Sequence, residues 1–147
     1  MDIKLDGIEE IIEYFENIEK ADGMKQAVKK ACALVEKNAK KKAPKDSGDL
    51  RRSIESKVED RGNNIIGTIF SPLEYAPYVE FGTGLFAANG DGRQTPWTYR
   101  DAKGEWHTTV GQHPQPFLQP ALDNNKREIN DILNDGFSRE LKKYVKR

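Results

Sequence analysis

Residues 50–70 of the chain read LRRSIESKVEDRGNNIIGTIF, and this stretch decides what kind of fold the sequence can form. The apolar residues of its first half fall on even-numbered positions with mostly polar residues between them, namely Leu50, Ile54 and Val58. That alternation predicts a strand with one buried face. The Gly-Asn pair at 62–63 predicts a turn, and the more apolar residues 64–70 are expected to return as the central strand of a small sheet.

Three helical patterns surround this hairpin. Apolar residues recur at helical spacing over residues 8–18, over 24–43 and over 117–144. Asp22-Gly23 is expected to separate the first two patterns, and Pro44 to end the second. The second pattern is rich in alanine on its inner face, so it predicts close packing against a neighbouring helix.

Two further features complete the predicted fold. Residues 3–5 predict a short edge strand, and Gly136 predicts a kink in the last helix, since Gly costs about 1 kcal/mol relative to Ala in a helix interior. The sequence therefore predicts a single α+β domain over 1–147. Its small mixed or antiparallel sheet would pack against two or three long helices.

The segment 82–116 is the unusual part of the chain. It holds six Gly and three Pro, which a central helix or strand would not tolerate. Within it, Trp97 and Tyr99 precede a polar turn and Trp106 follows, which predicts a projecting β-hairpin with its aromatic side chains on one face. A connection of this length is more often functional than idle.

Composition excludes several classes of function. The 147 residues carry 24 Lys+Arg and 24 Asp+Glu, and zero net charge argues against a dedicated nucleic-acid-binding protein. The single cysteine, Cys32, is interpreted as a buried structural thiol in an intracellular protein. The first residues lack a signal-peptide pattern, and no apolar run is long enough to span a membrane.

The residues that enzymes and metal sites require do not form a recognisable pattern. The two histidines, His107 and His113, both lie in the Gly/Pro-rich segment and lack the spacing of zinc ligands on a helix. Gly82-Thr83-Gly84 lacks the rest of a phosphate-binding loop. We therefore expect no catalytic residues, no metal and no cofactor. A small hydrolase or toxin-like enzyme is the rival class.

Charge is distributed unevenly along the chain. Residues 1–22 contain eight acids and two bases, whereas residues 25–52 contain ten bases and three acids. Solvated helix faces explain this most simply. The functional alternative is a polarised subunit whose acidic face meets the basic face of the next copy in a ring. A DNA-binding or DNA-passage-lining accessory protein is the other alternative, using Lys37, Lys40, Lys41, Lys42 and Lys45.

Three phrases of the sequence carry a resemblance to a known family. They are APKDSGDLRRSI at 43–54, YAPYVEFGT at 75–83 and QPFLQPAL at 115–122. Together they resemble the tail-completion, minor tail or head–tail joining proteins of long-tailed, lambda-like bacteriophages. The resemblance implies a non-enzymatic α+β subunit that finishes the tail or joins it to the head. Residues 85–113 are longer and more aromatic than this resemblance needs, so their role does not follow from it.

The residues of these phrases have expected structural roles. Gly48 suits a turn with a positive φ angle. Residues 75–81 are expected to form either a helical turn or an extended segment. Their aromatic residues, Tyr75, Tyr78 and Phe81, are interpreted as core residues rather than as contacts with a partner. Glu80 needs a partner, for which Arg51 or Arg52 is the candidate. The predicted structural motif comprises Pro44, Gly48, Leu50, Tyr75, Tyr78, Glu80, Phe81, Gly82, Pro116 and Phe117.

The functional expectation is assembly through protein contacts. The candidate interface residues are Phe86, Trp97, Tyr99 and Trp106, because large aromatic side chains are seldom exposed without consequence. The expected partners are other copies of the chain, free as monomers and oligomeric in the virion, and phage connector, tail terminator or tail-tube proteins. The expected location is the host cytoplasm during assembly and then the virion neck or tail. Deletion of 86–112 is expected to leave a folded core and weaken assembly.

Overall fold

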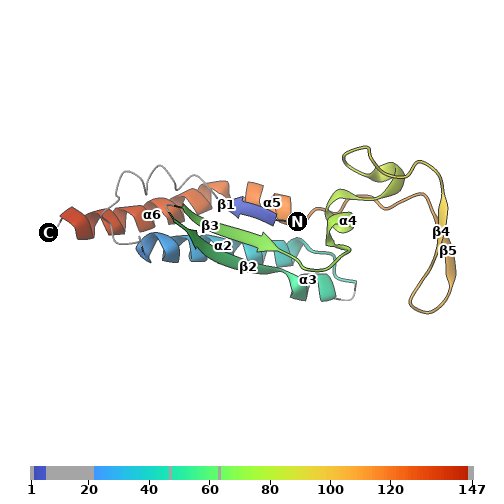
Figure 1. Cartoon of the computed structure of the whole chain (residues 1–147), viewed down its shortest axis with the longest axis horizontal. Helices are drawn as coiled ribbons and strands as arrows, with labels where there is room; N and C mark the ends of the chain where they lie inside the picture. Colours follow the sequence, from blue (N-terminus) through green and yellow to red (C-terminus); the bar gives the residue numbers. More distant parts are fainter. Residues whose placement is uncertain (1, 6–21, 47, 63, 146–147) are drawn as a thin grey trace.

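The computed structural model describes residues 2–5, 22–46, 48–62 and 64–145, and it has an α+β fold (Figure 1). The strands and helices of these residues, in chain order, are β1 Asp2–Leu5, α2 Asp22–Lys42, α3 Asp49–Ser53, β2 Glu55–Arg61, β3 Asn64–Phe70, α4 Ala76–Phe81, the 3₁₀ turn η2 Gly84–Phe86, β4 Trp97–Arg100, β5 Trp106–Thr109, α5 Leu118–Asp123 and α6 Lys126–Val145. The predicted helix over 8–18 lies outside the described residues.

The main sheet is antiparallel and three-stranded, in the order β1-β3-β2. The predicted hairpin is confirmed in register, with Arg61 opposite Asn64 and Glu55 opposite Phe70. As predicted, β3 is central and residues 3–5 form an edge strand. A mixed or an antiparallel sheet was expected, and the main sheet is antiparallel.

The helix α2 is the centre of the core. It contacts β2 and β3 as well as α5 and α6, so both the sheet and the C-terminal helices pack against it. Its buried face is made of small and apolar residues, namely Met24, Ala27, Val28, Ala31, Cys32, Val35 and Ala39. Asp22 and Gly23, where a break between two helical patterns was expected, form its first turn, and the preceding pattern lies outside the described residues.

The prediction that Leu50 belongs to a strand is wrong. Leu50 lies in the short helix α3, and the strand begins only at Glu55. Leu50 and Ile54 are nevertheless both buried, at 5% and 0% exposure. A spacing of four residues places two side chains on one face of a helix as well as on one face of a strand, so the pattern could not separate the two. Gly48, which precedes α3, has the expected positive φ of 77°.

The last helix is broken, but not at Gly136. The chain turns at Asn124 and Asn125, between α5 and α6, while α6 runs through Gly136 without interruption. A Cβ on Gly136 would lie 2.5 Å from the Ala27 Cβ of α2. The glycine therefore permits the close contact of α2 and α6 that the alanine-rich face predicted. Among the described helices, none is long and apolar enough to cross a membrane.

Candidate functional site

The clearest built feature outside the core is a carboxylate that holds the start of α5. Glu80, in α4, is 3% exposed. Its Oε2 accepts hydrogen bonds from the backbone N–H groups of Phe117 and Leu118 at 2.7 and 3.0 Å, and its Oε1 accepts one from Gln119 N–H at 2.9 Å. These are helix N-terminal donors, which have no partner within their own helix. A carboxylate also interacts favourably with the positive end of the helix dipole.

This contact joins the second and third phrases of the sequence across 37 residues. Neither Tyr75 nor Phe117, at the helix N-caps of α4 and α5, makes a side-chain capping bond, so Glu80 supplies the cap of α5 from another element. A further backbone bond of 2.8 Å joins Gln115 N–H to the Val79 carbonyl. The expected partner of Glu80, Arg51 or Arg52, was therefore wrong. We call this set of contacts the Glu80 clip.

The segment between the two sides of the clip, residues 83–113, is the arm. At its base Thr83 N–H donates to the Gln112 carbonyl and Leu85 N–H to the Val110 carbonyl, both at 2.9 Å. Gly84 and Gly111 face each other there, and a Cβ on either would collide with the opposite backbone. The glycines of this segment thus allow two chain segments to touch at the base of an ordered arm.

The end of the arm is the hairpin of β4 and β5, which Figure 1 shows beyond α4, apart from the main sheet. The register places Trp97 opposite Thr109, Tyr99 opposite His107 and Arg100 opposite Trp106. Residues that pair directly share a face, and faces alternate along a strand. Trp106 consequently lies on the face opposite to Trp97 and Tyr99, so the expectation of one aromatic face was wrong.

The exposed aromatic residues gather where the arm leaves the body. Tyr78 is 58% exposed, Phe81 48% and Tyr75 43%. These side chains are not core residues, contrary to the expectation. Tyr78, Phe81 and Trp97 line a largely apolar cleft of about 610 Å³ between α4, the turns after η2 and the start of β4. We call it the arm cleft.

The other candidate interface residue, Phe86, has a different position. Its ring stacks on His113 with the ring centroids 3.8 Å apart, and its side chain is half-buried. It therefore joins the two sides of the arm base. The arm cleft, by contrast, has exposed apolar walls, and such surfaces mark sites of protein contact.

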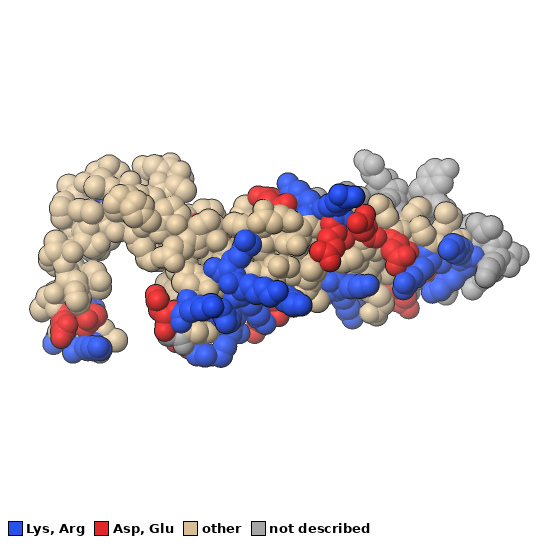
Figure 2. All heavy atoms as spheres, turned by 180° about the vertical axis from the view of Figure 1, so that it is seen from behind, with Lys and Arg blue, Asp and Glu red and all other residues tan. Residues whose placement is uncertain are grey.

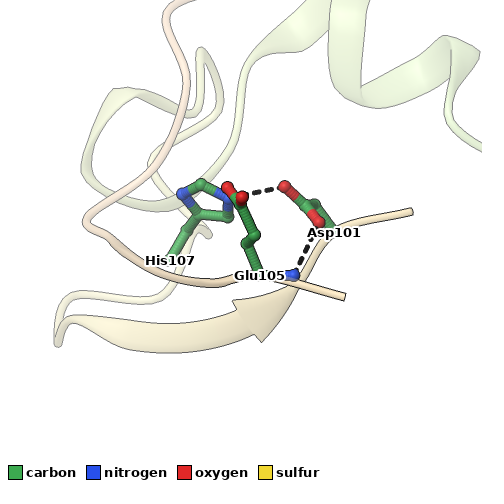
Figure 3. A group of neighbouring side chains, drawn as sticks. All are labelled: Asp101, Glu105 and His107. Atoms are coloured by element: carbon green, nitrogen blue, oxygen red, sulfur yellow. Dashed lines mark hydrogen bonds and ion pairs between the residues drawn. The ribbon is translucent and has the colours of Figure 1, made fainter. Parts of the chain in front are cut away.

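The tip of the hairpin brings together three side chains that the sequence analysis did not combine (Figure 3). Ligand atoms of Asp101, Glu105 and His107 lie within 4.8 Å of one another. His107 Nε2 lies 2.7 Å from Asp101 Oδ2, while Asp101 Oδ1 accepts backbone N–H groups of Lys103 and Glu105, each at 2.9 Å. The bond from His107, aided by these backbone groups, lowers the pKa of the Asp101 carboxyl. Both Asp101 oxygens thus have roles in forming the turn.

Cys32 and the basic residues of α2 complete the survey of reactive and charged groups. Cys32 is 1% exposed, and burial followed by the charge of Glu36 raises the pKa of its thiol to about 11. It is the buried structural thiol predicted from the sequence. A depression of about 380 Å³ is lined by the cations Lys40, Lys41, Lys45 and Arg51. Figure 2 shows Lys and Arg gathered on the part of the body nearest the arm.

Comparison with known protein families gives a match to part of the chain. A family model described as "Bacteriophage HK97-gp10, putative tail-component" matches residues 9–82. This range includes the first two phrases of the sequence up to Gly82 and ends where the arm begins. No curated protein and no solved structure matches the chain.

Proposed function

The chain belongs to the HK97-gp10-like family of bacteriophage tail components, and we propose that it acts at the neck, completing the tail or joining it to the head as a ring of copies. It is a structural component of a phage tail, and its expected partners are other virion proteins. What we propose beyond membership of the family is the ring, the position at the neck and the identity of the partners.

The observation that carries the proposal is the arm. A Gly-rich segment of this length would normally be a loop, yet here both sides of its base are held together by backbone hydrogen bonds. The Glu80 clip fixes the arm at its exit from α4 and at its return to α5. A rigid support of this kind suits an element that must present a contact surface at a fixed angle, because pre-organisation lowers the entropic cost of binding.

The surface of the arm supports protein contact rather than chemistry. The arm cleft is walled mainly by apolar and aromatic side chains of α4 and the arm, and the exposed charges on its lining are Asp91 and Arg93. On the face shown in Figure 2, the arm between its charged tip and the body carries no Lys, Arg, Asp or Glu. Interface cores are depleted in charge and enriched in Tyr, Trp and Phe.

The test is a phage in which this gene carries a deletion of residues 86–112. We expect the variant to fold, because the main sheet, α2 and α6 do not contain these residues. Infected cells should accumulate separate heads and tails, counted by negative-stain electron microscopy. The matched control is Lys103→Ala, a change at the exposed tip that leaves the arm in place. Normal numbers of joined particles from the deletion phage would refute the proposal.

One observation favours a second candidate, a surface that contacts DNA at the neck. Four cations, Lys40, Lys41, Lys45 and Arg51, line one depression, and a cluster of cations is the kind of surface that binds phosphate groups. Lys40, however, is already paired with Glu36 at 2.6 Å, which weakens the local positive field. Filter binding separates the two candidates: DNA affinity that falls steeply with salt would favour the second.

A further inference from the structure

The side chain of Trp106 is the most exposed large hydrophobic group among the described residues, at 70%. It lies on β5 next to the hairpin turn, opposite Arg100 on β4. Thr98 and Thr108 pair with each other on the same face. A lone indole presented by a short, regular hairpin has the shape of an anchor residue, and Trp is enriched among the residues that dominate interface energies.

The arm cleft offers an apolar receptor of suitable size on the same chain. Its walls include Tyr78 and Phe81 from α4 and Trp97 from the first position of β4. A chain cannot place its own Trp106 there. Trp97 and Trp106 belong to one paired hairpin and project from its opposite faces, so the indole cannot reach the side on which Trp97 lies without breaking the strand pairing.

The charges beside these two surfaces are complementary. The lining of the cleft carries two exposed charges, Asp91 and Arg93, and the Arg93 guanidinium lies 5.7 Å from the centroid of the Trp97 ring. Trp106 is likewise flanked by two exposed charges, Arg100 opposite it on β4 and Glu105 before it in the chain, so Arg100 can face Asp91 only if Glu105 is turned toward Arg93. If an indole entered the cleft from a second chain, the arginine beside it would approach the rim on which the aspartate lies. Opposite charges at an interface rim set the orientation and the rate of encounter.

We propose that Trp106 of one copy inserts into the arm cleft of the next copy, between Tyr78, Phe81 and Trp97, with Arg100 facing Asp91. The occupant of the cleft is therefore a second copy of this chain. Because donor and receptor are different surfaces, the contact is head-to-tail, and repetition of such a contact closes a ring or continues as a filament. The inference rests on the proposed function and specifies how its ring is made.

The direct test uses disulfide trapping in assembled tails. Cys32 is buried and does not interfere, so single cysteines report only new contacts. Thr108→Cys lies beside Trp106, and Asn89→Cys lies on the cleft. Tails assembled from a mixture of the two single-cysteine chains should give a disulfide-linked dimer containing one of each. Glu74→Cys, which is exposed and does not line the cleft, replaces Asn89→Cys as the control and should give none.

A charge exchange tests orientation independently. Asp91→Arg or Arg100→Asp alone should weaken incorporation of the chain into tails, and the double variant should restore it, because each arginine again faces an aspartate. Trp106→Ala should weaken association between copies by at least about ten-fold, the cost typical of an anchor residue. Tyr75→Ala, an exposed aromatic residue that does not line the cleft, should have little effect.

Absence of the mixed dimer, or an equal yield with the Glu74→Cys control, would overturn the inference. Failure of the charge exchange to restore incorporation would do the same. If particles lacking residues 86–112 still failed to join while no copies were trapped, the arm would bind another virion protein. The proposed function would then stand without the self-contact. If the deletion phage joined heads to tails normally, both the self-contact and the proposed function would be refuted.

Discussion

Replacement of Glu80 by alanine perturbs the contact that fixes the arm to the body. The carboxylate accepts three backbone N–H groups, of which those of Phe117 and Leu118 are fully buried. Leaving a buried donor without an acceptor costs about 1–3 kcal/mol, and hydrogen bonds to charged groups lie at the upper end. For two buried donors, with some relief from water entering the vacated space, we expect a loss of about 3 kcal/mol. That is a large share of the 5–15 kcal/mol typical of a domain.

Glutamine at the same position gives a graded result. Phe117 and Leu118 both donate to Oε2, so an amide oxygen placed there can keep these two bonds. The amide nitrogen would then face the N–H of Gln119, donor against donor. We expect Glu80→Gln to cost about 1–2 kcal/mol, less than alanine.

Urea unfolding followed by far-UV circular dichroism measures both variants. The matched control is Glu74→Ala, an exposed carboxylate in the same region, for which a change within about 0.5 kcal/mol is expected. A Glu80→Ala variant as stable as this control would refute the clip as a stabilising contact. Equal losses for alanine and glutamine would refute the argument from separate acceptor atoms.

Three further predictions follow from close contacts and from one titration. Gly136→Ala should destabilise the chain by about 1–3 kcal/mol despite the better helix propensity of alanine, because its Cβ would lie 2.5 Å from that of Ala27; a rise in melting temperature would contradict this. Gly84→Ala, which forces a Cβ at φ 61° against the Val110 carbonyl, should disorder the arm while the core melts normally, as hydrogen exchange would show; retained protection of the arm amides would contradict it. Because the folded pKa of Asp101 is lowered, its contribution to the tip is complete above the ordinary aspartate pKa and is lost as the pH falls through the folded value; the side-chain carboxyl carbon resonance of Asp101 should therefore titrate below the ordinary aspartate range, and a midpoint at or above the ordinary value would contradict this.

The regular parts of the fold could be predicted from the sequence because their signals are local. The bounds of β3 and the end of α2 follow from apolar periodicity and from Pro44. The α+β class follows in turn from a hairpin flanked by helical patterns. The helix α3 was missed for a local reason as well, since Leu50 and Ile54 suit either structure.

The features of the candidate site depend on pairing over long distances, which local patterns do not encode. Glu80 stood out as a charge between apolar neighbours, but its partners are backbone groups 37 to 39 residues away, and backbone groups leave no mark in composition. The opposite faces of Trp97 and Trp106 depend on the register set by the turn, and a shift of one residue reverses every side chain. The exposure of Tyr78 and Phe81 depends on where the arm leaves the body.

The measurement that tests the central claim most directly is a cryo-electron microscopy reconstruction of the head–tail junction of the phage that carries this chain. The account predicts a ring of copies at the neck, with each arm in contact with a neighbouring protein. Density for the chain at the distal end of the tail, or copies whose arms contact only solvent, would contradict it.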